Sequence, residues 1–208
     1  DYVYRVIGYD KRSNRGTPSE EITVTTLKDT ICPKVTKITP DPGYFKSEIN
    51  LRITTEDDYR VKSIEIQTST DKESWKTVSE IKATGESAKC TFDCKLDLKN
   101  YEEGSVFVRA KVYDSYGNVT EDKDLTCYEY VVDRTAPIQP TGVTASSGET
   151  EGGSSFVNIS WNAITDDNSF AYYRVYKSNS ADGEFTLLKN NVKTVNTYDE
   201  NVDSVSYT

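Results

Sequence analysis

Apolar and polar residues alternate with a period of two through most of this chain. Successive side chains of an extended strand point to opposite faces, so this period is typical of strands that bury one face. The first such segment is Tyr2–Tyr9, and the turn-forming stretch Asp10–Gly16 separates it from a second, Glu21–Thr26. Two strands alone do not make a stable domain, so this opening pair, residues 1–27, is expected to need a partner.

The middle of the chain predicts a complete β-sandwich over residues 28–133. Turn-forming clusters such as Pro40–Gly43 and Tyr116–Asn118 divide it into short segments of alternating pattern. Seven short strands with a turn about every 8–12 residues are typical of a sandwich of two antiparallel sheets. The seven segments are Lys34–Ile38, Ile49–Thr54, Val61–Thr68, Trp75–Ile81, Cys90–Leu98, Val106–Tyr113 and Leu125–Val132.

The last part of the chain, residues 134–208, predicts an incomplete sandwich. It offers five strand segments: Gly142–Ala145, Phe156–Trp161, Tyr172–Lys177, Phe185–Leu188 and Val195–Tyr198. The two strands that a full sandwich would still need are of the kind found over residues 1–27. The predicted fold class is therefore all-β, with one complete sandwich and one split between the two ends of the chain.

An internal repeat supports this organisation. Asp29 and Pro33 recur 104 residues later as Asp133 and Pro137, and 104 is half of the 208-residue length. The same spacing relates Arg5 to Arg109, Tyr9 to Tyr113, Asp10 to Asp114 and Asn14 to Asn118. A fixed spacing of this kind predicts that the chain spans two units of a repeat cut in mid-domain.

The segments Phe156–Trp161, Tyr172–Ser178 and Tyr4–Asp10, with Ser19–Thr26, resemble a fibronectin type III module of the bacterial kind in permuted order. Trp161 matches the core tryptophan of that family and Tyr4 its penultimate-strand tyrosine. The middle, about Lys28 to Asp133, is similar to bacterial Ig-like repeats of large surface proteins. The resemblance implies Ig-like and fibronectin type III-like sandwiches in a secreted or cell-surface protein, and it specifies architecture better than ligand.

The apolar strands at both ends would leave open edges, which favour aggregation when unpaired. Two arrangements would pair them: one period excised from a covalent tandem array, or separate subunits that donate the opening hairpin to a neighbour's incomplete sandwich. The near-seamless joint between Thr208 and Asp1 favours the covalent array. Both give a head-to-tail fibre whose partners are neighbouring copies, whereas an arbitrary chain boundary would give a sticky fragment.

Composition excludes several classes of function. The 25 Lys and Arg stand against 34 Asp and Glu, a formal charge of −9, so a nucleic-acid partner is not expected. Apolar runs are only a few residues long, against about 20 for a membrane-spanning helix, so no membrane insertion is expected. The chain has no His, the commonest general base, and we expect no catalysis and no enzyme activity.

Acidic residues gather at the expected junctions between modules. In a sandwich of this topology, the loop after the second strand and the last hairpin loop share the pole where the chain enters. One predicted set is Asp29, Asp57, Asp58, Asp114 and Asn118, and the other is Asp133, Asp166, Asp167, Asp10 and Asn14. Oxygen-only donors suit Ca²⁺, so we predict a calcium ion at each junction. The alternative is ordinary turn chemistry of Asp and Asn.

The four cysteines, Cys32, Cys90, Cys94 and Cys127, all fall in the middle module. An even number in an extracellular chain favours two disulfides. The first and last strands of such sandwiches are commonly neighbours, which gives Cys32–Cys127 and, by elimination, Cys90–Cys94. A fully extended strand would place the Cα atoms of the second pair about 13 Å apart, so that bond requires a bulge. The three connectivities and free thiols stay open.

These features together predict a non-catalytic structural or adhesive repeat of an extracellular stalk or filament. Host or cell-wall glycans are further candidate partners if exposed tyrosines form an aromatic platform. The residues concerned are Tyr2, Tyr4, Tyr9, Tyr172, Tyr173 and Tyr176. Alternating tyrosines also commonly divide between core and solvent. The alternative function is an accessory spacer or carbohydrate-binding region of a secreted glycan-degrading enzyme.

Overall fold

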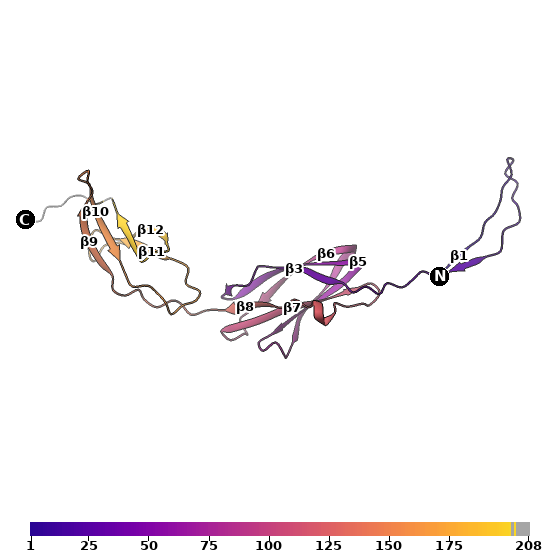
Figure 1. Ribbon diagram of the computed structural model, residues 1–208, viewed down its shortest axis with the longest axis horizontal. Coiled ribbons are helices and arrows are strands. Elements are labelled where there is room, and N and C mark those ends of the chain that lie inside the picture. Colours follow the sequence, from indigo (N-terminus) through magenta and orange to yellow (C-terminus); the bar gives the residue numbers. More distant parts are fainter. Residues whose placement is uncertain (201, 203–208) are drawn as a thin grey trace, which may run out of the picture. The chain divides into compact units, whose positions relative to one another are not determined.

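The computed structural model of the chain describes residues 1–200 and 202 and confirms the predicted all-β fold class. The chain divides into two compact units, Asp1–Val132 and Asp133–Thr208. Figure 1 shows the strands of each unit along the chain. Among the described residues, no helix is long and apolar enough to span a membrane.

The first unit opens with an antiparallel hairpin of β1 (Tyr2–Tyr4) and β2 (Ile22–Val24). Both strands are shorter than the segments of alternating pattern that predicted them. Beyond β1, a side chain replaces a backbone acceptor of the strand pairing, because the Val6 amide donates to Ser19 Oγ at 3.0 Å. The chain pairs again at Tyr9 and Arg15, next to the Asp10–Asn14 turn. Residues 1–27 are therefore one long hairpin with a regular base.

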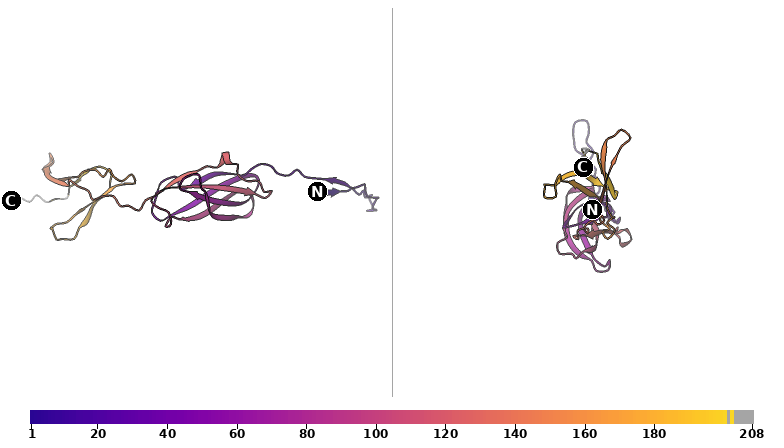
Figure 2. Two further views of the ribbon diagram at one scale, coloured as in Figure 1. Left: turned by 90° about the horizontal axis from the view of Figure 1, so that it is seen from below. Right: turned by 90° about the vertical axis from the view of Figure 1, so that its left-hand side faces the viewer.

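The sandwich that follows contains six strands and one short 3-10 helix, Asp122–Asp124. The strands are β3 (Lys34–Thr39), β4 (Tyr44–Phe45), β5 (Glu48–Ser69), β6 (Lys76–Asp97), β7 (Gly104–Asp114) and β8 (Tyr128–Val132). They are hydrogen-bonded in the order β3-β5-β7-β8-β4, and β6 pairs with the other edge of β5. Figure 2 shows them from two further sides.

Strands β5 and β6 each belong to both layers of the sandwich. The sequence predicts two strands in place of each, yet each is a continuous strand of 22 residues. The β5–β6 register shifts between Glu56 and Val61, where β5 changes layer. Before the shift β5 pairs with β3, and after it with β7. A bent ribbon of β5 and β6 thus joins the two sheets and places residues 57–60 at one pole.

Inward-facing residues of both layers form the core of the sandwich. Ile38, Leu51 and Ile53 come from one layer and Ile66 and Val108 from the other, and all are buried. Full burial of such a side chain contributes roughly 1.5–3 kcal/mol. Buried residues alternate with less buried ones along much of β5 and β7, which is the period of two on which these strands were predicted.

Tyr130 of β8 is fully buried at the edge of this core, beneath the chain between β3 and β4. Its hydroxyl donates to the carbonyl of Pro40 at 2.8 Å, and its ring meets that of Phe45 edge-on at 5.6 Å. β4 in turn lies parallel to β8, with Tyr44 opposite Val131. Tyr130 thereby fastens the β3–β4 connection to β8.

We expect the free energy of unfolding to fall from about pH 10 to about pH 12 through Tyr130. Chiefly through burial, the pKa of Tyr130 is raised from 10.0 to about 12. The unfolded chain therefore loses this phenol proton first, and folding stability declines as the pH rises through this window. Denaturant unfolding of the Tyr130→Phe variant should show a smaller decline, and equal slopes in the two proteins would contradict the assignment.

The described residues of the second unit contain five strands in two small sheets. β9 (Thr144–Glu149), β10 (Ser155–Ser160) and β13 (Asn196–Asp199) form one sheet, and β11 (Tyr173–Lys177) and β12 (Thr186–Val192) form the other. Trp161 and Tyr173 are each only 8% exposed and meet edge-on at 5.1 Å. All five predicted strands of this part of the chain are present.

Candidate functional site

Two hairpin turns separated by 104 residues have the same hydrogen bonds. In each, the Asn side chain and backbone amide donate to the Asp carboxylate: Asn14 to Asp10 at 2.7 and 2.9 Å, and Asn118 to Asp114 at 2.6 and 2.7 Å. A backbone bridge closes each turn, Tyr9 to Arg15 and Tyr113 to Val119. The repeat seen in the sequence therefore has a matching local structure.

The surroundings of the two turns differ. Asp10 is exposed, and the hydrogen bonds from Asn14 and Arg12 lower the pKa of its carboxyl. Asp114 has no exposed surface, and the Asn118 side chain also donates to the carbonyl of Asp29 at 3.2 Å. The second turn is thus built into the pole of the sandwich, beside the segment that leads into β3.

An acidic triad of Asp29, Asp57 and Asp114 lies at this pole. One carboxylate oxygen of each residue lies within 4.8 Å of the other two. Asp29 precedes β3, Asp57 lies in the bend of β5, and Asp114 ends β7. The change of layer in β5 brings the three elements to one place, as the sequence predicts for the first acidic set.

Backbone amides hold one carboxylate oxygen of Asp29 and one of Asp57. Asp29 Oδ1 accepts from the amide of Ile31 at 2.9 Å, and Asp57 Oδ2 accepts from that of Arg60 at 2.9 Å. The remaining oxygens, Asp29 Oδ2 and Asp57 Oδ1, are shielded from solvent and have no hydrogen-bond partner among the described residues. Burial raises the pKa of Asp57, and the charges of Asp58 and Asp114 raise it further.

Basic side chains near the triad pair with other acids. Lys34 and Lys89 contact Glu56 at 3.0 and 3.7 Å, and Lys34 lowers the pKa of that glutamate. Arg60 contacts Glu86 at 2.9 Å. Within the described part of the chain, the triad carboxylates form no ion pair with Lys or Arg.

The other predicted metal-site residues have separate places. Asp58 is exposed and lies outside the triad. Asn118 contacts Asp114 of the triad through its side-chain amide nitrogen, which is a hydrogen-bond donor. In the second predicted set, Asp10 and Asn14 belong to the first unit, whereas Asp133, Asp166 and Asp167 belong to the second. That set stays a prediction.

The predicted disulfides are wrong, because Cys32, Cys90, Cys94 and Cys127 are all free thiols. Cys90 and Cys94 lie on a regular part of β6, opposite Thr55 and Leu51, with no bulge to shorten a separation of about 13 Å. Cys32 precedes β3 and Cys127 precedes β8, but β5 and β7 separate those two strands. Burial raises the pKa of the Cys90 thiol, which disfavours the reactive thiolate.

Apolar side chains are exposed on the opening hairpin and on the second unit. Tyr2, Val3, Tyr4, Val6, Ile22 and Val24 are exposed on the hairpin, so neither of its faces is covered. On the second unit the exposed side chains include Val143, Tyr172, Tyr176, Phe185, Leu187 and Tyr198. Tyr173 is buried, so the tyrosines on β11 divide between core and surface. Large exposed apolar patches of this kind commonly mark a surface that binds a partner.

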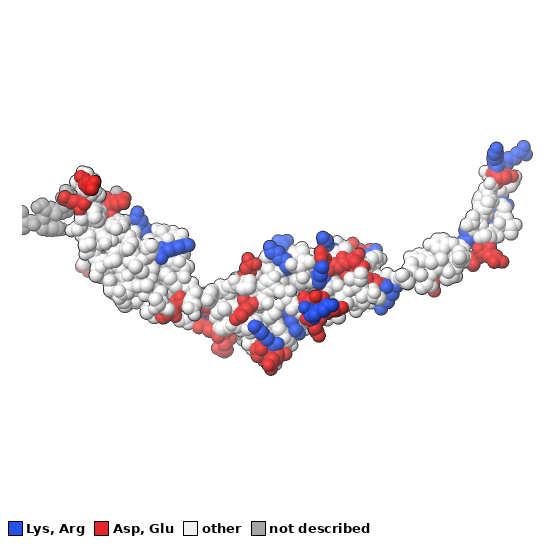
Figure 3. All heavy atoms as spheres, viewed as in Figure 1, with Lys and Arg blue, Asp and Glu red and all other residues white. Residues whose placement is uncertain are grey.

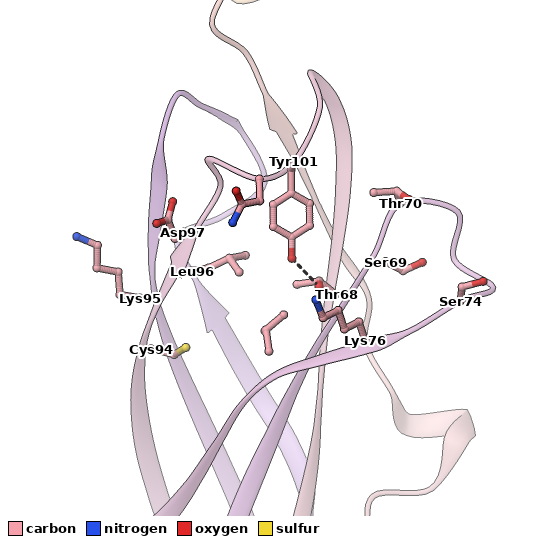
Figure 4. A pocket seen from close by; sticks show the side chains of 12 residues that line it. Thr68, Ser69, Thr70, Ser74, Lys76, Cys94, Lys95, Leu96, Asp97 and Tyr101 are labelled. Atoms are coloured by element: carbon pink, nitrogen blue, oxygen red, sulfur yellow. Dashed lines mark hydrogen bonds between the residues drawn. The ribbon is translucent and has the colours of Figure 1, made fainter.

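A cavity of about 500 Å³ opens between the two halves of β6, beside the end of β5. In Figure 4 the Tyr101 side chain points into it, and its hydroxyl lies 2.8 Å from that of Thr68. Hydroxyl and amide groups line much of the wall, with Lys76, Lys95 and Asp97 among the charged side chains. Lys95 pairs with Glu48 outside the cavity at 2.5 Å. Among the described residues that line this cavity, Asp97 is the one with a carboxylate.

Charges on the displayed face of the sandwich are mixed. Figure 3 shows Lys and Arg interleaved with Asp and Glu there, in keeping with a chain of formal charge −9. The chain matches no protein-family model and no curated protein sequence. The acidic triad and the two exposed apolar surfaces are therefore the features on which a function can be argued.

Proposed function

We propose that this chain is a non-catalytic structural or adhesive repeat of an extracellular stalk or filament. In this assembly the opening hairpin, residues 1–27, completes the second unit of a neighbouring copy, head to tail. The observation that carries the proposal is that apolar side chains are exposed on two surfaces, one on the opening hairpin and one on the second unit. Each is the kind of surface that a sandwich normally buries.

The repeat spacing indicates how the two surfaces would fit. Tyr2, Tyr4, Val6 and Gly8 stand 104 residues before the buried core residues Val106, Val108, Ala110 and Val112 of β7. Residues 2–9 of the hairpin are therefore the counterpart of β7. In the complete sandwich β7 pairs with the second half of β5, so the hairpin needs a strand of that kind as its neighbour.

β11 is the counterpart of the second half of β5. The stretch from Ser69 to Trp75, which begins at the last residue of β5, resembles the stretch from Ser180 to Phe185, which follows β11. The second half of β5 pairs with β6 on one edge and with β7 on the other, whereas within the described residues β11 pairs only with β12. The free edge of β11 is thus the place where the hairpin of a neighbouring copy would add its first strand.

Self-association of the full chain tests the proposal. We expect sedimentation velocity to show species larger than one chain, growing with concentration, and electron microscopy to show beaded fibres with two beads per chain. Association through β11 should also protect the amides of residues 2–9 from hydrogen exchange. A chain that stays monomeric at high concentration, with these amides unprotected, would contradict the proposal.

A second candidate is carbohydrate binding, as in a module accessory to a secreted glycan-degrading enzyme. Tyr172, just before β11, and Tyr176 on β11 are exposed, and Arg174 between them donates to the Tyr172 hydroxyl at 3.2 Å. Exposed aromatic rings beside a polar donor suit stacking on a sugar. Binding on a glycan array by a chain that stays monomeric would favour this function over assembly.

A further inference from the structure

The spacing of the acidic triad suits a single metal ion. Two ligands of one Ca²⁺ ion, each about 2.4 Å from it, lie at most roughly 5 Å apart. The donor atoms of Asp29, Asp57 and Asp114 all lie within 4.8 Å of one another. The spacing is therefore compatible with all three binding the same ion.

Two carboxylate oxygens at this pole are shielded from solvent without a hydrogen-bond partner among the described residues. Asp29 Oδ2 and Asp57 Oδ1 are shielded from solvent and accept no hydrogen bond from the part of the chain that the structure describes, while the other oxygen of each side chain is held by a backbone amide. A shielded oxygen without a partner is costly, and more so when it carries charge. This observation is independent of the clustering, because clustered surface carboxylates are ordinarily hydrated.

The described basic residues around the triad are paired with other acids. Lys34 and Lys89 are paired with Glu56, and Arg60 with Glu86. Asp114, with no exposed surface, receives hydrogen bonds from Asn118 and from the Tyr116 amide but forms no ion pair within the described residues. Three buried or half-buried carboxylates repel one another unless a cation lies among them.

We propose that Asp29, Asp57 and Asp114 bind one Ca²⁺ ion. The donors are all oxygen, which excludes a preference for zinc or copper, and calcium accepts irregular sets of carboxylates, carbonyls and water. The ion would tie the segment before β3 to the bend of β5 and the end of β7. The site lies wholly within the first unit, so calcium binding can be tested independently of head-to-tail assembly.

The test is calcium binding by the full chain, measured by calorimetric titration and thermal unfolding. We expect one ion per chain and, at a free calcium concentration a hundred times Kd, a rise in Tm of about 10 °C over the chelator-treated protein. Magnesium at the same concentration should raise Tm much less. No binding heat together with an unchanged Tm would overturn the proposal.

A matched pair of variants locates the ion. Asp57→Asn keeps the shape of the side chain but removes its charge, so calcium affinity should fall at least about tenfold. In chelator the same variant should be as stable as the wild type or more so, because repulsion within the triad is relieved. Asp58→Asn, at the exposed neighbouring residue, should bind calcium as the wild type does. Equal losses in the two variants would overturn the assignment to the triad.

Discussion

Replacement of Val6 by Asp abolishes head-to-tail association of the chain, if residues 2–9 add to the free edge of β11. Val6 is exposed on the hairpin and stands 104 residues before Ala110, a buried residue of β7. In the assembled sandwich the new carboxylate would be buried without a partner. We expect the association constant from sedimentation equilibrium to fall at least about a hundredfold.

Ile7→Asp is the matched control for that variant. It makes a similar change of chemistry one residue away, on the opposite face of the same strand, at the position equivalent to Lys111. That face remains accessible in a completed sandwich, so association should change much less than with Val6→Asp. Similar losses in both variants would contradict the predicted orientation of the hairpin, and no loss in either would contradict strand addition by the hairpin.

The largest effect on folding is expected from Ile66→Ala in the second half of β5. Ile66 has no exposed surface and packs in the core shared by both layers. Truncation of a buried isoleucine to alanine costs about 2–5 kcal/mol, because apolar contact is lost and a cavity remains. Native-state hydrogen exchange of β5 and β7 amides would report this loss for the first unit alone.

Ile31→Ala provides the comparison for Ile66→Ala. Ile31 is 56% exposed in the segment before β3, so the same truncation should change the free energy of unfolding by under about 0.5 kcal/mol. A similar cost at both positions would contradict the layer assignment of β5. An unchanged exchange rate in Ile66→Ala would contradict it as well.

The period of two was sufficient to predict nearly every strand, but not where strands join. The charged stretch Glu56–Arg60 interrupts the pattern and predicts a loop, yet β5 continues because its pairing with β6 resumes at Val61 opposite Ser87. β4 was missed since Tyr44–Phe45 is too short to show any period. Hydrogen bonding across strands decides both cases, and a single sequence does not show it.

The acidic triad was predictable, whereas the cysteine pairing was not. The sequence places Asp29, Asp57 and Asp114 at one pole of a sandwich, and they do cluster, although Asp57 lies in the bend of the continuous strand β5 and not in a loop. The Cys32–Cys127 pairing assumed that the first and last strands are neighbours. Here the short β4 takes that place beside β8, and β3 pairs in the other layer. The two-residue strand β4 is thus the edge neighbour of β8, the place that the predicted pairing gave to the first strand.

The parallel pairing of β4 with β8 sets how the sandwich would respond to tension. The chain enters through β3 and β4 and leaves through β8, and β4 and β8 run in the same direction with Phe45 opposite Val132. A pull on the two ends would therefore load their hydrogen bonds in shear, all together rather than one after another. Single-molecule stretching should show the β4–β8 pairing breaking first, before the bent β5–β6 ribbon opens.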